Sequence, residues 1–256
     1  MRKVTSDRLE TRIYPNRTVM GAAAAEDIAA CILGLLSEKD TINMIFAAAP
    51  SQNDMLSALI ADRRIPWQRI NAFHMDEYVG LSPEAPQRFA TFLKKAIFDK
   101  VPFRSVNLID GNVPPETECA RYSALLSAHP VDIVCMGIGE NGHIAFNDPH
   151  VADFDDPTLV KVVDLDNTSR MQQVHDGCFA TLDDVPTHAL TLTVPALAAA
   201  KYHFCVVPAP TKAWAVRETI FSKIGEHCPA TIMRRLENAV MYCDEDSAAL
   251  LTEVDG

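Results

Sequence analysis

Two short segments of the 256-residue sequence carry the side chains best suited to acid/base chemistry. The first, residues 73–78 (FHMDEY), places Asp76 and Glu77 behind an apolar run. Because neighbouring residues of an extended chain point to opposite sides, only one of these acids is expected to face a cleft. The second holds His143 and Asp148, at a spacing around a turn that allows a carboxylate to orient an imidazole. Each segment also has a purely structural interpretation. In the first, Asp76 and Glu77 are solvated acids at a strand end; in the second, Asp148 only accepts hydrogen bonds from backbone N–H groups.

A glycine-rich turn comes directly before His143. Residues 137–142 match G-x-G-x-x-G after an apolar run, a pattern found in dinucleotide-binding proteins. Such a site needs a full helix behind the glycines, whereas Pro149 follows after fewer than two helical turns, so no dinucleotide cofactor is expected. The glycines are instead expected to let the chain turn tightly and to bring backbone donors, at Gly139 and Gly142, close to a small ligand.

Two further positions are suited to hold an anion. Ser51 is expected to begin a helix in the pattern Ser-Gln-Asn-Asp, with its hydroxyl accepting from the backbone N–H of Asp54. Thr211 is expected to cap a later helix, which puts Lys212 at the positive end of that helix, although a plain surface lysine would have the same sequence. No compact pattern of metal-ligating residues is present, so no metal is expected.

The elements that must position these side chains alternate between short β-rich runs and longer segments of helical periodicity. Strands are expected at 42–49, 70–75, 133–137, 189–194, 203–207 and 240–243. Helices are expected at 20–36, 52–61, 87–98, 116–127, 212–224 and 229–235. This alternation is typical of a three-layer α/β fold, a mostly parallel open sheet with helices on both faces. Ligands of such sheets bind beyond the carboxyl ends of the strands, so the turns after residues 49, 75, 138 and 207 form the predicted cleft.

Composition excludes several classes of protein. The chain has 34 acidic and 23 basic residues, and a net charge of -11 without a basic patch argues against nucleic acid as a partner. The longest apolar stretch, residues 22–36, is interrupted by two acids and is too short and too charged to span a membrane. No secretory signal is visible, and seven cysteines without a C-x-x-C pattern favour reduced thiols and the cytoplasm. Without repeats or linkers, residues 1–256 are expected to form a single domain, and a homo-oligomer remains open.

The motifs together resemble the glucosamine-6-phosphate deaminase (isomerase) family, whose wider relatives include 6-phosphogluconolactonases. The resemblance covers residues 20–244 and is most specific at 73–81 (FHMDEYVGL) and 137–149 (GIGENGHIAFNDP). The segment 144–147 (IAFN) is deaminase-like rather than lactonase-like. The family implies a Rossmann-like deaminase/isomerase fold and a cofactor-free conversion of an amino-sugar phosphate, such as glucosamine 6-phosphate, to a ketose 6-phosphate plus ammonia.

The resemblance also implies a role for each matching residue. Asp76 would move a proton between C1 and C2 of the sugar, while His143 would assist ring opening with Asp148 orienting it. A general base works best with a pKa near the operating pH, so a desolvated pocket is expected to raise the pKa of Asp76. Asn141 stands where the family often has Asp, and Asp148 stands where it has Glu. The amide of Asn141 can still hold a substrate hydroxyl or orient the imidazole.

The sequence departs from the family at the phosphate site. Residues 48–51 (AAPS) replace the usual Gly-Gly-Thr-Pro turn, and an acidic segment at 151–157 stands where relatives have a phosphate-binding arginine. Ser51 and Lys212 remain as candidates for the anion, and Arg170 is an unassigned basic candidate. The phosphate pocket is therefore expected to be reorganised, weakened or adapted to a different sugar acid. A lactone hydrolase with His143 activating water and a non-catalytic sugar-phosphate-binding protein are the alternative functions.

Overall fold

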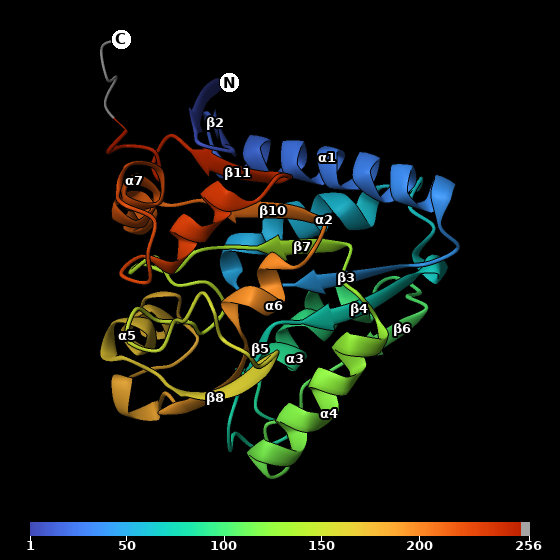
Figure 1. Cartoon of the computed structure of the whole chain (residues 1–256), viewed down its shortest axis with the longest axis vertical. Coiled ribbons are helices and arrows are strands. Elements are labelled where there is room, and N and C mark those ends of the chain that lie inside the picture. Colours follow the sequence, from blue (N-terminus) through green and yellow to red (C-terminus); the bar gives the residue numbers. More distant parts are fainter. Residues whose placement is uncertain (252–256) are drawn as a thin grey trace.

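An eight-stranded, mostly parallel sheet forms the centre of the computed structural model, which describes residues 1–251 (Figure 1). In spatial order the strands are β1 (Arg2–Ser6), β2 (Leu9–Tyr14), β11 (Ala239–Asp244), β10 (Tyr202–Val207), β7 (Ile133–Met136), β3 (Ile42–Phe46), β4 (Ile70–His74) and β6 (Ser105–Asn107). β1 and β2 form an antiparallel hairpin, and every other neighbouring pair is parallel. The predicted open parallel sheet is therefore confirmed.

Helices cover both faces of this sheet. One face carries α1 (Arg17–Glu38), α2 (Asn53–Ala61), and α3 (Phe89–Leu93) with the π-helical turn Lys94–Phe98. The other face carries α4 (Pro115–Ala128), α6 (Val194–Ala198), α7 (Ala213–Phe221) and a 3-10 segment at Pro229–Arg235. Along β3 the side chains alternate, with Met44 and Phe46 in the first core and Ile45 in the second. This two-sided burial confirms the predicted three-layer fold.

The long helix α1 begins at the N-cap Asn16, whose side chain accepts from the backbone N–H of Val19. The helix has 22 residues, and by length and composition alone it is long and apolar enough to cross a membrane. The prediction that residues 22–36 are too short to span a membrane is wrong, because the helix extends beyond them at both ends. Half of its most apolar stretch is buried, where Ile28 and Ile32 pack against the sheet and α2, as in the core helix of a globular domain.

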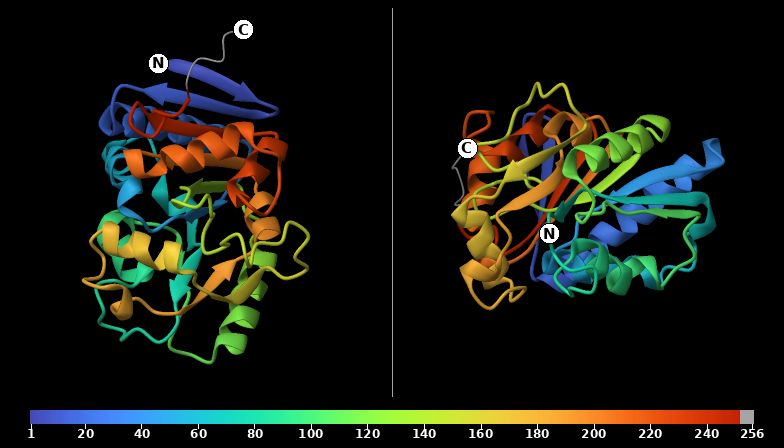
Figure 2. Two further views of the ribbon diagram at one scale, coloured as in Figure 1. Left: turned by 90° about the vertical axis from the view of Figure 1, so that its left-hand side faces the viewer. Right: turned by 90° about the horizontal axis from the view of Figure 1, so that it is seen from below.

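A second, antiparallel sheet consists of β5 (Asp76–Tyr78), β9 (His188–Leu192) and β8 (Val160–Asp164). With α5 (Asn167–His175) it lies below the main sheet in Figure 1, and Figure 2 shows the same region from two other sides. The predicted strand 189–194 exists as β9, but its assignment to the parallel sheet is wrong. A run of β-forming residues predicts a strand without saying which distant strand it pairs with.

The two predicted side-chain caps are also wrong. Short 3-10 turns at Pro50–Gln52 and Pro210–Lys212 precede α2 and α7, and neither Ser51 nor Thr211 makes a capping hydrogen bond. Each proline fixes its φ in the helical range and starts the turn one residue earlier than expected. The hydroxyl residues consequently lie inside a turn, while Gln52 and Lys212 occupy the N-cap positions of the two α-helices.

Candidate functional site

One pocket collects the turns that follow several strands of the main sheet. The space between its walls, including the open mouth that is continuous with solvent, is about 780 Å³. The turns contribute Ala47, Ala48, Ala49, Pro50 and Ser51 after β3, Met75 and Asp76 after β4, Gly137, Ile138 and Gly139 after β7, and Pro208, Ala209, Thr211 and Lys212 after β10. The remaining lining residues are Arg17, Phe89, His143, Ala145, Phe146, Gln172, Gln173 and Asp176. The predicted convergence of these four turns is confirmed.

Asp76 lies at the start of β5 and is only 7% exposed. Its carboxylate accepts no hydrogen bond from the described residues, and burial together with the nearby charge of Glu77 raises its pKa well above 3.8. This confirms the expected direction. Glu77 is separated from the pocket, because its oxygens accept from the backbone N–H groups of Tyr78, Phe89 and Ala90 at the start of α3. Of the two adjacent acids, only Asp76 lines the pocket.

The ring of His143 is held by three groups on its Nδ1 side. That nitrogen lies 2.8 Å from Asn141 Oδ1, 3.1 Å from Asp148 Oδ1 and 2.8 Å from Ser169 Oγ. Since an amide oxygen and a carboxylate can only accept, the network assigns the proton of the neutral ring to Nδ1 and leaves a lone pair on Nε2. An imidazole in this tautomer can accept or return a proton through Nε2.

Asp148 is fully buried behind His143 and does not itself line the pocket. Burial by itself would raise its pKa, but hydrogen bonds and the charge of His143, together with Asn141 and Ser169, outweigh burial and lower the pKa to about 2. Asn141 Nδ2 donates at 3.0 Å, and Ser169 Oγ donates to the same oxygen. The shorter side chain of Asp148 therefore still reaches the ring. Asn141 also lies outside the pocket lining and contacts His143, which favours the orienting role over contact with substrate.

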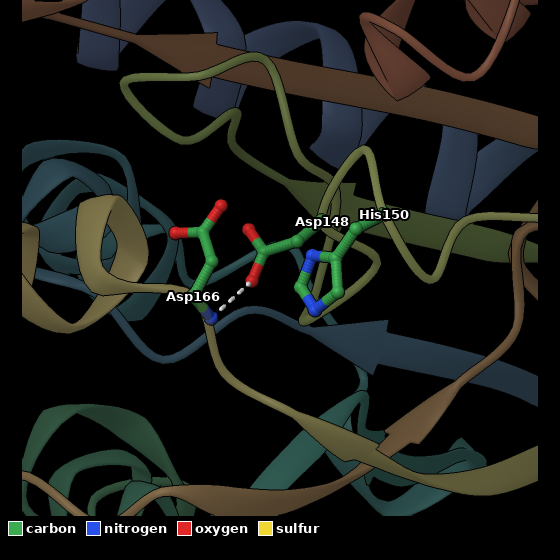
Figure 3. A group of neighbouring side chains, drawn as sticks. All are labelled: Asp148, His150 and Asp166. Atoms are coloured by element: carbon green, nitrogen blue, oxygen red, sulfur yellow. Dashed lines mark hydrogen bonds between the residues drawn. The ribbon is translucent and has the colours of Figure 1, made fainter.

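Asp148 also belongs to a group of potential metal-binding side chains with His150 and Asp166 (Figure 3). Each offers one ligand atom, and these atoms lie within 4.8 Å of one another. The backbone N–H of Asp166 donates to Asp148 Oδ2 at 3.4 Å, while Oδ1 serves the histidine network. Hydrogen bonds thus engage both oxygens of Asp148.

Two basic side chains also line the pocket. Lys212 is 5% exposed, and the described residues offer its ammonium group no ion pair within 4 Å. Burial lowers its pKa, against the opposing charges of Asp176 and Glu140. The sequence reasoning missed Arg17, the first residue of α1, whose Nη2 donates to the carbonyl of Pro50 at 2.9 Å. Arg17 thus places a second basic group beside residues 48–51 (the anion turn), and its Nε pairs with Asp54 Oδ2 at 2.7 Å. It lies far along the chain from segment 151–157, where the family has its arginine.

The glycines of the turn make room rather than supply donors to a ligand. The N–H of Gly139 donates to the carbonyl of His143 at 2.9 Å, and that of Gly142 donates to Gly139 at 3.1 Å. Gly139 lines the pocket and Gly142 does not, so their predicted use as ligand donors is corrected. A Cβ on Gly139 would lie 2.1 Å from the imidazole, and one on Gly142 would lie 2.4 Å from Cys228 Sγ at a φ of +80°. The backbone N–H groups of Gly139 and Gly142 therefore form hydrogen bonds within the turn itself.

Helix α5 contributes a wall that sequence reasoning did not predict. Ser169, Gln172 and Gln173 lie on its buried side, and Gln172 Oε1 accepts from the backbone N–H of Glu140 at 2.9 Å. The contact ties this helix to the glycine turn. Its sequence, NTSRMQQVH, has no apolar stripe, so the pattern used to find the other helices is absent.

Known proteins resemble the chain in sequence and in fold. Residues 15–242 match the family described as glucosamine-6-phosphate isomerases/6-phosphogluconolactonase. A glucosamine-6-phosphate deaminase of Bacillus cereus (strain B4264) is 33% identical over 217 residues, which span 84% of this chain and 80% of the relative. A monomeric glucosamine-6-phosphate deaminase superposes with a TM-score of 0.84 at 26% identity, covering 94% of this chain and 99% of its own. The 6-phosphogluconolactonase of Thermotoga maritima superposes at 0.73 with 22% identity over 91% and 99% of the two chains, which shows a shared fold.

Proposed function

The chain belongs to the glucosamine-6-phosphate isomerase/6-phosphogluconolactonase family, as its motifs predicted, and on that basis we propose that it is an amino-sugar phosphate deaminase/isomerase. The proposed reaction converts glucosamine 6-phosphate, or a close relative, and water into a ketose 6-phosphate and ammonia. It uses acid/base groups of the protein and no cofactor.

One observation supports this proposal most strongly: a buried carboxylate without a hydrogen-bond partner among the described residues shares its pocket with an oriented imidazole and a buried ammonium group. The three groups are Asp76, His143 and Lys212. The pocket walls exclude most water from the carboxylate, which raises its affinity for a proton and makes it a stronger base than a solvated acid. A buried positive group in the same pocket suits a substrate that carries a phosphate.

The proposed steps follow from this arrangement. His143 Nε2 accepts the proton of the C1 hydroxyl and passes it to the ring oxygen, so that the bond from C1 to the ring oxygen breaks and an aldehyde forms. Asp76 then removes the proton from C2 while the aldehyde oxygen takes up a proton, which gives an enol that carries the amino group at C2. Asp76 returns its proton to C1 and the nitrogen gives up one proton, which replaces the one taken by the oxygen and yields a 2-imino sugar with a hydroxyl group at C1. Water adds to that imine, and the bond from C2 to nitrogen breaks to release ammonia and the ketose. Asp148 keeps the imidazole oriented throughout.

The phosphate site is proposed to use Ser51, Lys212 and Arg17. Lys212 contributes a desolvated charge, and Arg17 brings a guanidinium group that lines the pocket while its Nε pairs with Asp54 Oδ2 at 2.7 Å. In this proposal Arg17 takes the place of the arginine that is missing from segment 151–157, so that a different part of the chain contributes to the phosphate site.

Three broader features belong to the same proposal. Residues 1–256 are proposed to act as one domain, because the main sheet and the α5 region both line the pocket. All seven cysteines are free thiols, which supports a reducing compartment such as the cytoplasm. A small sugar phosphate is the proposed partner, and assembly into a homo-oligomer is left to measurement of molecular mass.

Incubation of the purified protein with glucosamine 6-phosphate tests the proposal. Ammonia and fructose 6-phosphate should appear in equal amounts. Hydrolysis of 6-phosphogluconolactone above its spontaneous rate, without ammonia release from any amino-sugar phosphate, would instead select the lactonase reaction. Thermal stabilisation by both compounds without turnover of either would indicate a binding protein and refute the enzymatic proposal.

A further inference from the structure

Gln52 lies directly beneath the anion turn and is completely buried. Its Nε2 donates to Ser51 Oγ at 3.0 Å and to the carbonyl of Val206, in strand β10, at 3.1 Å. Its Oε1 is also buried and has no hydrogen-bond partner among the described residues. The amide thus links the floor of the sheet to the hydroxyl at the edge of the pocket.

The two contacts determine the direction of the Ser51 hydrogen bond. A backbone carbonyl can only accept, so the amide nitrogen rather than the amide oxygen must face Val206. That nitrogen has two protons, and the second one points to Ser51 Oγ. Ser51 therefore accepts from Gln52, which leaves its own hydroxyl proton free for another acceptor. Ser51 lines the pocket, so the acceptor within reach is the ligand.

Other groups around the turn make the Ser51 hydroxyl proton more important for binding an anion. Pro50 has no N–H, and the N–H of Gln52 is already bonded to the carbonyl of Ala49 at 2.9 Å. A Cβ on Gly137 would lie 3.0 Å from Gln52 Nε2, so glycine leaves the space that the amide occupies. With backbone donors reduced, the Ser51 hydroxyl is a main uncharged donor that the turn offers to an anion.

We propose that Gln52 is a positioning residue that directs the Ser51 hydroxyl proton into the pocket, where it is donated to the substrate phosphate. The inference rests on the proposed function. Gln52 does not touch the substrate in this scheme and acts only through Ser51. An anion accepts the pre-oriented proton without first having to turn the hydroxyl, which lowers the cost of binding.

A double-mutant cycle tests the inference, using Gln52→Met, Ser51→Ala and the double variant. Methionine keeps the length and the apolar stem but removes both amide protons. We expect Gln52→Met to raise KM for glucosamine 6-phosphate and the dissociation constant of inorganic phosphate by roughly three- to tenfold, with kcat nearly unchanged. Ser51→Ala should have a similar effect. The double variant should bind no worse than Ser51→Ala, because Gln52 has nothing left to position.

The control is the Ser51→Ala background itself. If Gln52 has a purely structural role, Gln52→Met will weaken phosphate binding by the same factor with or without the Ser51 hydroxyl. Such additivity would overturn the inference. Phosphate binding by Gln52→Met at the wild-type level would also overturn it. If Gln52→Met does not fold, Gln52→Leu serves in the same cycle, because leucine also lacks the amide protons and brings no charge of its own near the anion.

The phosphate measurements separate this inference from the proposed reaction. Coupled phosphate binding without ammonia release would support the positioning role and refute the deaminase activity. Ammonia release without coupling between the Gln52 and Ser51 substitutions would support the deaminase activity and refute the positioning role. A wild-type protein that does not bind inorganic phosphate would overturn the positioning role.

Discussion

Replacing Asp76 with asparagine removes the proposed base while preserving the size of the side chain. General-base catalysis contributes about 10²- to 10⁴-fold in rate, and here the same group both removes and delivers the proton. We expect kcat of Asp76→Asn to fall about a thousandfold, which corresponds to about 4 kcal/mol in the barrier at about 1.4 kcal/mol per factor of ten. KM should change by less than about threefold, because the phosphate contacts are untouched.

The same variant should be more stable than the wild type at neutral pH. Since burial raises the pKa of Asp76, the folded protein holds this proton at pH values where the unfolded chain has released it. The unfolding free energy of the wild type consequently decreases as pH rises from about 3.8 through the native pKa, and the loss persists above it. Asparagine removes this cost. The melting temperature of Asp76→Asn should exceed that of the wild type at pH 7, and the difference should vanish below about pH 4.

Ammonia release under saturating glucosamine 6-phosphate and thermal unfolding at several pH values provide both readouts. Glu77→Gln is the matched control, because it alters a buried acid one residue away that accepts three backbone N–H bonds. It should lower stability by about 1 to 3 kcal/mol. The folded fraction should keep most of its turnover, with the pH profile displaced to lower pH because the charge of Glu77 no longer raises the pKa of Asp76. A variant Asp76→Asn with more than a tenth of the wild-type kcat, or with reduced stability at pH 7, would refute the assignment of Asp76 as a buried base.

Three other changes test the rest of the pocket. Lys212→Gln should raise KM for glucosamine 6-phosphate about 10- to 100-fold with a smaller effect on kcat, because a charged phosphate contact is lost; equal KM values would contradict the anion site. Ser169→Ala should lower kcat about tenfold at unchanged KM, because the ring of His143 loses one orienting group. Steady-state kinetics measure both constants, and a melting curve shows whether a lower kcat comes only from loss of the folded state. Gly139→Ala should lower kcat at least 100-fold, because its Cβ would lie 2.1 Å from the imidazole. Gly34→Ala is the control, since nothing lies within 4 Å of the new Cβ, and it should retain activity and gain up to about 1 kcal/mol in stability.

Local patterns were sufficient to predict the type of most core elements and three of the polar side chains that line the pocket. The apolar runs at β3, β4, β7, β10 and β11 predicted buried parallel strands, since burial on both faces requires nearly continuous hydrophobic residues. Asp76, His143 and Lys212 were found because each lies in the turn after such a strand, and the ends of parallel strands meet at one edge. The family assignment came from the same short motifs.

Contacts between distant segments were decided only by the tertiary structure. Nothing in the residues of β9 says that it pairs with β5 and β8, and the polar sequence of α5 hides a helix that is stabilised by its neighbours. Ser169 reaches His143 across 26 positions of sequence, and Gln52 reaches Val206 across 154. A local pattern reports which face of an element is apolar. Which donor meets which acceptor depends on how the whole chain packs, because a hydrogen bond is lost with a shift of about 1 Å.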